Sequence, residues 1–340
     1  MAPQPRSILV YIGSSADDAL GENMIKLPFL WALRDAFPDA RITWIPGFGP
    51  AQFDGILKSL TQGLIHEMVT DLYLGTAPLA LLSRRQPLAG REFDLIIDTQ
   101  KMPVRTLLLR RVPHQRFVSS TWGYVFSDAK PPADVPAPRL LIDKLLALVA
   151  AAGGRAIRPD HHAPVPADCR EAALAMLPEG PVYVGFAPGA GRKDTGKCWP
   201  LDRFISLAND QADRGRVPVF ILGPGEAEWL DHLRNAVAGA VFPGWDGEAY
   251  AQGLRDPALT VALGGRLATA VANCSGTGHM LAAGGAPMVS LYGPSDAGKF
   301  APYTPHIRTL SAQDFGGNAI GAIPAEAVAE AIQAHLADWG

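Results

Sequence analysis

The chain has 340 residues, of which 48% are hydrophobic and 19% are charged, and its formal net charge is −3. A chain longer than about 250–300 residues is expected to build two hydrophobic cores, and therefore two domains. The slightly acidic balance excludes binding to nucleic acid or to an anionic membrane through overall charge alone.

Short apolar runs alternate with helical patterns through the first half of the chain. Residues 8–12, 41–45 and 93–98 are predicted to be strands, and residues 24–37 and 139–152 to be helices. The continuous apolar centre of 93–98 indicates a strand buried on both faces, as in a parallel sheet. The first half is therefore predicted to be an α/β domain.

A stretch rich in glycine and proline, residues 153–181, interrupts this alternation and is typical of an interdomain crossing. Strands at 182–186 and 217–222 and a helix at 201–214 then resume it. We expect Rossmann-like domains at residues 1–160 and 161–340. The last helix could pack back on the first of these domains.

The most informative segment runs from Asn273 to His279, between an apolar strand (267–272) and a helix of small residues (280–283). Such a turn leaves the first helical N–H groups unpaired and lets an anion approach them. We predict a diphosphate seat formed by Ser275, Gly276, Thr277 and His279. The alternative is an ordinary glycine-rich turn between a strand and a helix.

A second loop, residues 187–200, also follows a strand and precedes a helix, and it contains the cations Arg192, Lys193 and Lys197. A leaving diphosphate gains negative charge, which fixed cations and N–H dipoles stabilise. Lys197 is the favoured candidate; the alternative is a surface lysine whose stem lies along Trp199.

Three carboxylates, Asp17, Asp18 and Glu22, follow the first strand. A positioned carboxylate is suited to accept the proton of an attacking hydroxyl. A cluster that only caps the following helix is the alternative.

Taken together, these segments resemble glycosyltransferase family 9, the lipopolysaccharide heptosyltransferases. The resemblance rests on Asn273, Ser275, Gly276, His279, Ala282 and Ala283, on residues 292–296, on Lys197, Trp199 and Pro200, on Gly21 and Pro28, and on the turn at residues 98–100. Four positions depart from the usual motifs: Cys274 and Glu22 each replace Asp, Thr277 replaces Pro, and Lys101 replaces Gly.

The resemblance implies roles for individual residues. It implies that Glu22 is the base, with Asp17 and Asp18 as competitors, and that the position of Cys274 meets the donor sugar. Glu226 would hold the donor ribose, with Glu228 as the fallback and a helix-start acid as the alternative. The acceptor side would include Asp18, Gln100, Lys101 and Arg105. For Gln100, Lys101 and Arg105, a capped turn is the competing interpretation.

The resemblance also implies a GT-B fold, in which two Rossmann-like domains face a central cleft. The implied activity is inverting, metal-independent transfer of a sugar from ADP-heptose or another nucleotide-diphosphate sugar, with no cofactor. The implied acceptor is an anionic saccharide or glycolipid of lipopolysaccharide or another cell-surface glycan. The sequence has no Asp-x-Asp triplet of the kind that holds a metal-bound diphosphate.

Three widely spaced cysteines, Cys169, Cys198 and Cys274, are typical of a reducing compartment. The sequence shows no signal-peptide pattern and no apolar run of 18 residues, so we expect a cytoplasmic protein. A glycolipid acceptor would add peripheral contact with the inner membrane. A cationic group in the N-terminal half would either dock such an acceptor or form a solvated face: Arg84, Arg85, Arg91, Lys101, Arg105, Arg110, Arg111 and Arg116.

The sequence bears on two other classes of function. A Rossmann oxidoreductase needs Gly-x-Gly-x-x-Gly after an early strand, and residues 13–18 do not supply it. A catalytically inactive sugar-nucleotide-binding or scaffolding protein of the same fold stays open, because Glu22 and Cys274 both replace aspartates.

Overall fold

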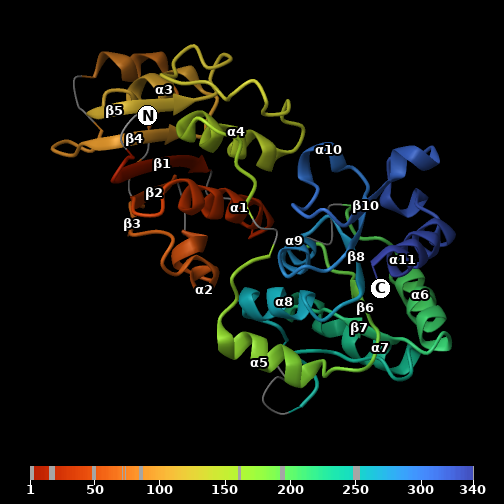
Figure 1. The fold of residues 1–340 in the computed structure, drawn as a ribbon. Coiled ribbons are helices and arrows are strands. Elements are labelled where there is room, and N and C mark those ends of the chain that lie inside the picture. The colour runs from red at the N-terminus through yellow and green to blue at the C-terminus, as the bar shows by residue number, and fades with distance from the viewer. Residues whose placement is uncertain are drawn as a thin grey trace. The chain divides into compact units, whose positions relative to one another are not determined.

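A computed structural model describes residues 4–14, 20–47, 51–70, 72, 74–83, 87–159, 162–191, 196–247 and 253–339 (Figure 1). The chain divides into two compact units, Met1–Asp160 and His161–Gly340. Each unit contains one parallel five-stranded sheet with helices packed on it. The predicted α/β class is therefore confirmed.

Unit 1 has the sheet order β3-β2-β1-β4-β5. Its strands are β1 (Ser7–Ser14), β2 (Arg41–Gly47), β3 (Glu67–Met68), β4 (Phe93–Asp98) and β5 (His114–Ser119). Its helices are α1 (Leu20–Ala36), α2 (Lys58–Thr61), α3 (Pro103–Leu109) and α4 (Leu141–Gly153), with 3-10 turns η1 (Gln52–Asp54) and η2 (Pro78–Leu82).

The core of unit 1 forms around β1 and β4, which pair in parallel register. Ile8, Leu9 and Val10 on β1 and Leu95 and Ile96 on β4 are fully buried, as the continuous apolar run of β4 predicts. Helices α1 and α4 pack against each other. The sequence interpretation of Glu22 as a loop residue is wrong: α1 begins at Leu20, so Glu22 lies in its first turn.

Unit 2 has the sheet order β10-β9-β8-β6-β7. Its strands are β6 (Tyr183–Ala187), β7 (Val217–Phe220), β8 (Thr269–Asn273), β9 (Met288–Tyr292) and β10 (Ile307–Ser311). Its helices are α5 (Ala167–Met176), α6 (Leu201–Asp213), α7 (Leu230–Ala236), α8 (Pro257–Gly264), α9 (Gly276–Ala283), α10 (Ala297–Phe300) and α11 (Ala325–Trp339), with 3-10 turns η4 (Pro224–Trp229), η5 (Ala312–Phe315) and η6 (Ile320–Ala322).

Helix α9 is held close to α8 by two glycines. A Cβ atom at Gly264 would collide with the backbone of Leu281, and one at Gly284 would collide with the carbonyl of Val261. Only glycine allows backbones to approach so closely. This packing fixes the direction of α9, which begins at Gly276 and is therefore longer than the predicted helix at 280–283.

The last helix, α11, packs against β8, β9 and α6 of its own unit. Val328 and Ile332 on this helix are fully buried in the core of unit 2. Across the described residues, every helix is too short or too polar to span a bilayer.

Candidate functional site

The candidate donor site lies at the carboxyl edge of the sheet of unit 2. Strands β6, β8 and β9 run parallel to one another, so the loops that follow them open at one edge. These loops begin at Pro188, Cys274 and Gly293. Ligands of open α/β sheets bind at such an edge.

Asn273, the last residue of β8, ties two of these segments together. Its side-chain nitrogen donates to the carbonyl of Pro188 at 2.7 Å. Its side-chain oxygen accepts from the backbone N–H of Trp199 at 3.1 Å. Since Asn273 and Trp199 are both buried, this amide fixes both ends of the 188–199 loop to the end of β8.

The charge of Lys197 acts on the thiol of Cys274. Burial raises the pKa of the Cys274 thiol, while a hydrogen bond with Ser295 and the charge of Lys197 lower it. Cys274, Ser295 and Lys197 come from the three different loops at this edge, and all three contribute to these interactions. Cys274 supplies no carboxylate at this position, where the family motif has aspartate.

The first turn of α9 completes the edge. Ser275 is the N-cap residue, and its hydroxyl accepts from the N–H of Gly278 at 3.3 Å. The N–H groups of Gly276 and Thr277 are among the first of the helix, which have no partner within it. The helix dipole adds partial positive charge at the same place.

His279 is the one titratable side chain on α9. Burial lowers the pKa of its imidazole to about 4, so the ring is neutral at physiological pH. It can donate or accept one hydrogen bond to a ligand, but it supplies no positive charge.

Glu226 lies beside the same edge, in the turn after β7. Its carboxylate accepts from the N–H of Gly223 at 2.9 Å and so caps η4. A Cβ atom at Gly189 would lie 2.6 Å from Oε1 of Glu226, which places the carboxylate directly against the 188–199 loop. The capping contact agrees with the helix-start alternative, and the ribose role stays a prediction; the fallback, Glu228, is exposed.

In unit 1, the turn after β4 is built on Asp98. This buried carboxylate accepts from the N–H of Gln100 at 3.0 Å, from the hydroxyl of Thr106 at 2.6 Å and from the hydroxyl of Ser119 at 3.0 Å. Thr121 closes the network by donating to the carbonyl of Gln100 at 3.1 Å. Burial nevertheless raises the pKa of Asp98 to about 6.

Gln100 and Arg105 connect this turn to the end of β1. Gln100 donates through its side chain to the carbonyl of Ile12, and Arg105 donates to the carbonyl of Gly13 at 3.3 Å. Arg105 also donates to the carbonyl of Leu74 at 3.0 Å. These contacts show that Gln100 and Arg105 stabilise the fold of unit 1. Their role in binding the acceptor stays a prediction. Lys101 and Glu22 are exposed.

Of the remaining predicted residues, some lie outside the described residues and others form ion pairs in unit 1. Asp17, Asp18, Arg192 and Lys193 are outside the described residues, as are Arg84 and Arg85. Arg91 pairs with Glu67, and Arg110 pairs with Asp128 at 3.0 Å. The cationic group is therefore partly neutralised. The described residues contain no cluster of His, Cys, Asp or Glu that could hold a metal ion.

Sequence reasoning missed the contacts of Asn273 and the polar network around Asp98. Asn273 and Asp98 carry only a weak signal in the sequence, because each is a polar residue at the end of a buried apolar strand. Their partners, Pro188, Trp199, Thr106, Ser119 and Thr121, are distant in sequence. Only the folded chain identifies them.

Several solved structures are similar to this chain over nearly its whole length. A glycosyl transferase family 9 protein from Veillonella parvula DSM 2008 has a TM-score of 0.69 and 19% identity, covering 98% of each chain. ADP-heptose lps heptosyltransferase II of E. coli has a TM-score of 0.61 and 20% identity, covering 98% of this chain and 99% of that one. E. coli heptosyltransferase WaaC, solved with ADP, has a TM-score of 0.64 and 18% identity, covering 97% and 99%.

At these identities the structures show a shared fold, and it is the GT-B type expected from the sequence. No curated protein matches the chain by sequence. The family model described as glycosyltransferase family 9 (heptosyltransferase) matches residues 81–318 and so includes β4, the 188–199 loop and α9. The chain therefore belongs to glycosyltransferase family 9 and is a glycosyltransferase.

Proposed function

We propose that this glycosyltransferase transfers a sugar from a nucleotide-diphosphate donor to a saccharide acceptor, with inversion at the anomeric carbon and without a metal ion. ADP-heptose is the proposed donor class, because two of the similar structures are heptosyltransferases described with ADP or ADP-heptose. An anionic saccharide or glycolipid of lipopolysaccharide is the proposed acceptor, and the cytoplasm is the proposed compartment.

The single observation that carries the donor site is the pair of hydrogen bonds from Asn273, which tie both ends of the 188–199 loop, the loop of Lys197, to the end of β8 directly before α9. A diphosphate placed there would meet one fixed cation and several backbone N–H groups. These groups stabilise the charge that develops when the bond between sugar and phosphate breaks. That supply of positive charge supports the metal-independent part of the proposal.

The proposed base is Glu22 in the first turn of α1. A carboxylate can accept the proton of the acceptor hydroxyl as that hydroxyl attacks the anomeric carbon from the face opposite the leaving diphosphate. Glu22 is exposed, as a side chain that must reach a bound acceptor needs to be. Asp17 and Asp18 remain the competing candidates.

The test is a thermal-shift screen with ADP-, GDP-, UDP- and dTDP-sugars, followed by a turnover assay with the sugar that binds. A ligand at about 100 times its dissociation constant raises the unfolding free energy by about 2.7 kcal/mol, which a melting curve resolves. Stabilisation by a nucleotide sugar together with release of the nucleoside diphosphate on adding acceptor supports the proposal. Tight binding without turnover across an acceptor panel would instead indicate an inactive sugar-nucleotide-binding protein.

A further inference from the structure

The carboxyl end of β1 is held by side chains of residues 99–105, the segment that follows β4. Three consecutive carbonyls at this end each accept a hydrogen bond from that segment: those of Tyr11, Ile12 and Gly13. The respective donors are the hydroxyl of Thr99 at 3.0 Å, the side-chain amide of Gln100, and the guanidinium of Arg105 at 3.3 Å. The position of the end of β1 therefore depends on the position of this segment.

Gly13 allows this contact to be close. A Cβ atom at this position would lie 2.8 Å from the ring of Tyr11 and 3.0 Å from Cγ of Gln100. The φ of Gly13 is 62°, in the left-handed region that favours glycine. The Gln100 side chain therefore packs directly on the backbone of Gly13, so displacing Gln100 also displaces the end of β1.

Asp98 fixes the 99–105 segment at both of its ends. Its carboxylate is fully buried and accepts from the N–H of Gln100 at 3.0 Å and from the hydroxyl of Thr106 at 2.6 Å. A third donor is the hydroxyl of Ser119 on β5, at 3.0 Å. A buried carboxylate is tolerated as an ion only where such donors surround it. A neutral amide of the same shape cannot accept all three bonds, because one of its two ends is a donor.

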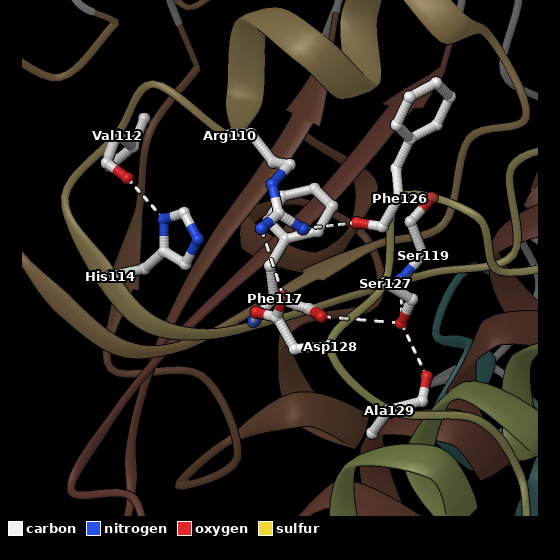
Figure 2. Close-up of polar contacts among 9 residues, drawn as sticks. All are labelled: Arg110, Val112, His114, Phe117, Ser119, Phe126, Ser127, Asp128 and Ala129. Atoms are coloured by element: carbon white, nitrogen blue, oxygen red, sulfur yellow. Dashed lines mark hydrogen bonds and ion pairs between the residues drawn. The ribbon is translucent and has the colours of Figure 1, made fainter.

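Ser119 is itself held at the outer edge of β5 (Figure 2). Its N–H donates to the hydroxyl of Ser127 at 3.3 Å, and that hydroxyl donates to the carbonyl of Ala129 at 2.6 Å. Next to it, Asp128 accepts from the N–H of Phe117 at 2.7 Å. Ser119 is therefore fixed by this loop through its backbone and by Asp98 through its hydroxyl.

The end of β1 leads directly to the proposed base. Residues 15–19 connect β1 to α1, which carries Glu22 in its first turn. The competing candidates, Asp17 and Asp18, belong to this connection and lie outside the described residues. Whichever of these carboxylates is the base, its position depends on where β1 ends. A misplacement of about 1 Å can lower a catalysed rate by about 100-fold.

We propose that Asp98 is a positioning residue for sugar transfer, because it fixes the 99–105 segment, which fixes the end of β1 and so the start of the chain segment that carries the base. Asp98 is fully buried and acts through these contacts without touching a substrate. The inference rests on the proposed function, since the base is part of that proposal. The effect of Asp98 on β1 is measured without any substrate, so the two proposals can fail separately.

The experiment compares Asp98→Asn with the matched control Asp94→Asn. Asp94 lies on the same strand, β4, and accepts from the N–H groups of Arg6 at 2.7 Å and Ser7 at 3.0 Å, where β1 begins, and from the side chain of Gln115 at 2.8 Å. Both substitutions keep the shape of the side chain and disturb hydrogen bonds around β4. Only those of Asp98 reach the segment that holds the carboxyl end of β1.

Amide hydrogen exchange supplies the measurement that needs no substrate. Exchange at residues 11–14 should be at least about tenfold faster in Asp98→Asn and within about twofold of the unaltered chain in Asp94→Asn. In turnover assays, Asp98→Asn should lower kcat by at least about tenfold and leave the donor KM unchanged, because the predicted donor residues lie in unit 2. Asp94→Asn should keep the kcat of the unaltered chain.

Thr121→Val replaces Asp98→Asn if that variant does not fold. Thr121 is buried and donates to the carbonyl of Gln100 at 3.1 Å, and valine has the same shape without the hydroxyl. Exchange at residues 11–14 should then be faster, and kcat lower, by at least about threefold.

The proposal is overturned if exchange at residues 11–14 is equal in Asp98→Asn and Asp94→Asn, or if their kcat values are equal. Thr121→Val that matches the unaltered chain in both measurements overturns it as well. Absence of turnover in the unaltered chain would refute the proposed function, and exchange alone would then decide whether Asp98 holds the end of β1.

Discussion

Replacing Asn273 by alanine tests whether one buried amide organises the donor edge. The substitution removes the bonds to the Pro188 carbonyl and the Trp199 N–H and leaves both backbone groups without a partner in a buried place. Each unsatisfied buried group costs about 1–3 kcal/mol, so we expect the free energy of unfolding to fall by about 3 kcal/mol. For a domain of this size, 1 kcal/mol corresponds to about 2–4 °C, which predicts a melting temperature lower by about 6–12 °C.

The matched control is Asn209→Ala on α6. Asn209 donates one bond to the carbonyl of Ala236 at 3.1 Å and is half-buried, so its loss should cost about 1 kcal/mol. Melting curves with and without the stabilising nucleotide sugar measure both stability and affinity. Asn273→Ala should also bind the donor more weakly, because the 188–199 loop is no longer tied to β8. Melting temperatures that agree for the two variants, with donor affinity intact, would refute this reasoning.

Three further predictions concern the site. Lys197→Ala should raise the donor dissociation constant and lower turnover together, because its charge opposes the diphosphate in ground and transition states alike; kinetics equal to those of the control Lys58→Ala would remove Lys197 from the site. Glu22→Gln should keep donor affinity and lower kcat by about two to four orders of magnitude; near-full activity, with loss of activity in Asp17→Asn or Asp18→Asn, would move the base into the preceding loop. Burial lowers the pKa of His279 from 6.5 to about 4, so the folded state binds fewer protons than the unfolded state in that range, and stability should rise from about pH 4 to about pH 6.5. His279→Gln should flatten this rise in urea titrations, and an unchanged slope would show that the imidazole is not buried as described.

The sequence predicts well those features that depend on neighbouring residues. The apolar run 93–98 predicts strand β4 with its observed bounds, because burial on both faces leaves a continuous signal. The change in composition after Gly153 indicates a crossing, and the chain divides into its two compact units inside that stretch, between residues 160 and 161. The family motifs identify α9 and Lys197, which the structure places at one edge of the sheet.

Features that depend on residues far apart in the sequence are harder to predict from it. Glu22 is predicted to lie before the helix because nothing in the sequence marks Leu20 as a helix start. The capping of η4 by Glu226, by contrast, is a short-range contact with Gly223 that the helix-start alternative anticipates. The network of Asp98 joins residues 8 to 21 positions apart, and no local pattern predicts which hydroxyls will meet.

The most direct test of the central claim is a crystal structure of the chain with the stabilising nucleotide sugar bound. We predict that the diphosphate lies within hydrogen-bond distance, about 3 Å, of Lys197 or of the N–H groups of Ser275, Gly276 and Thr277. A diphosphate more than about 6 Å from both, beyond any direct hydrogen bond, would contradict the assignment of the donor site.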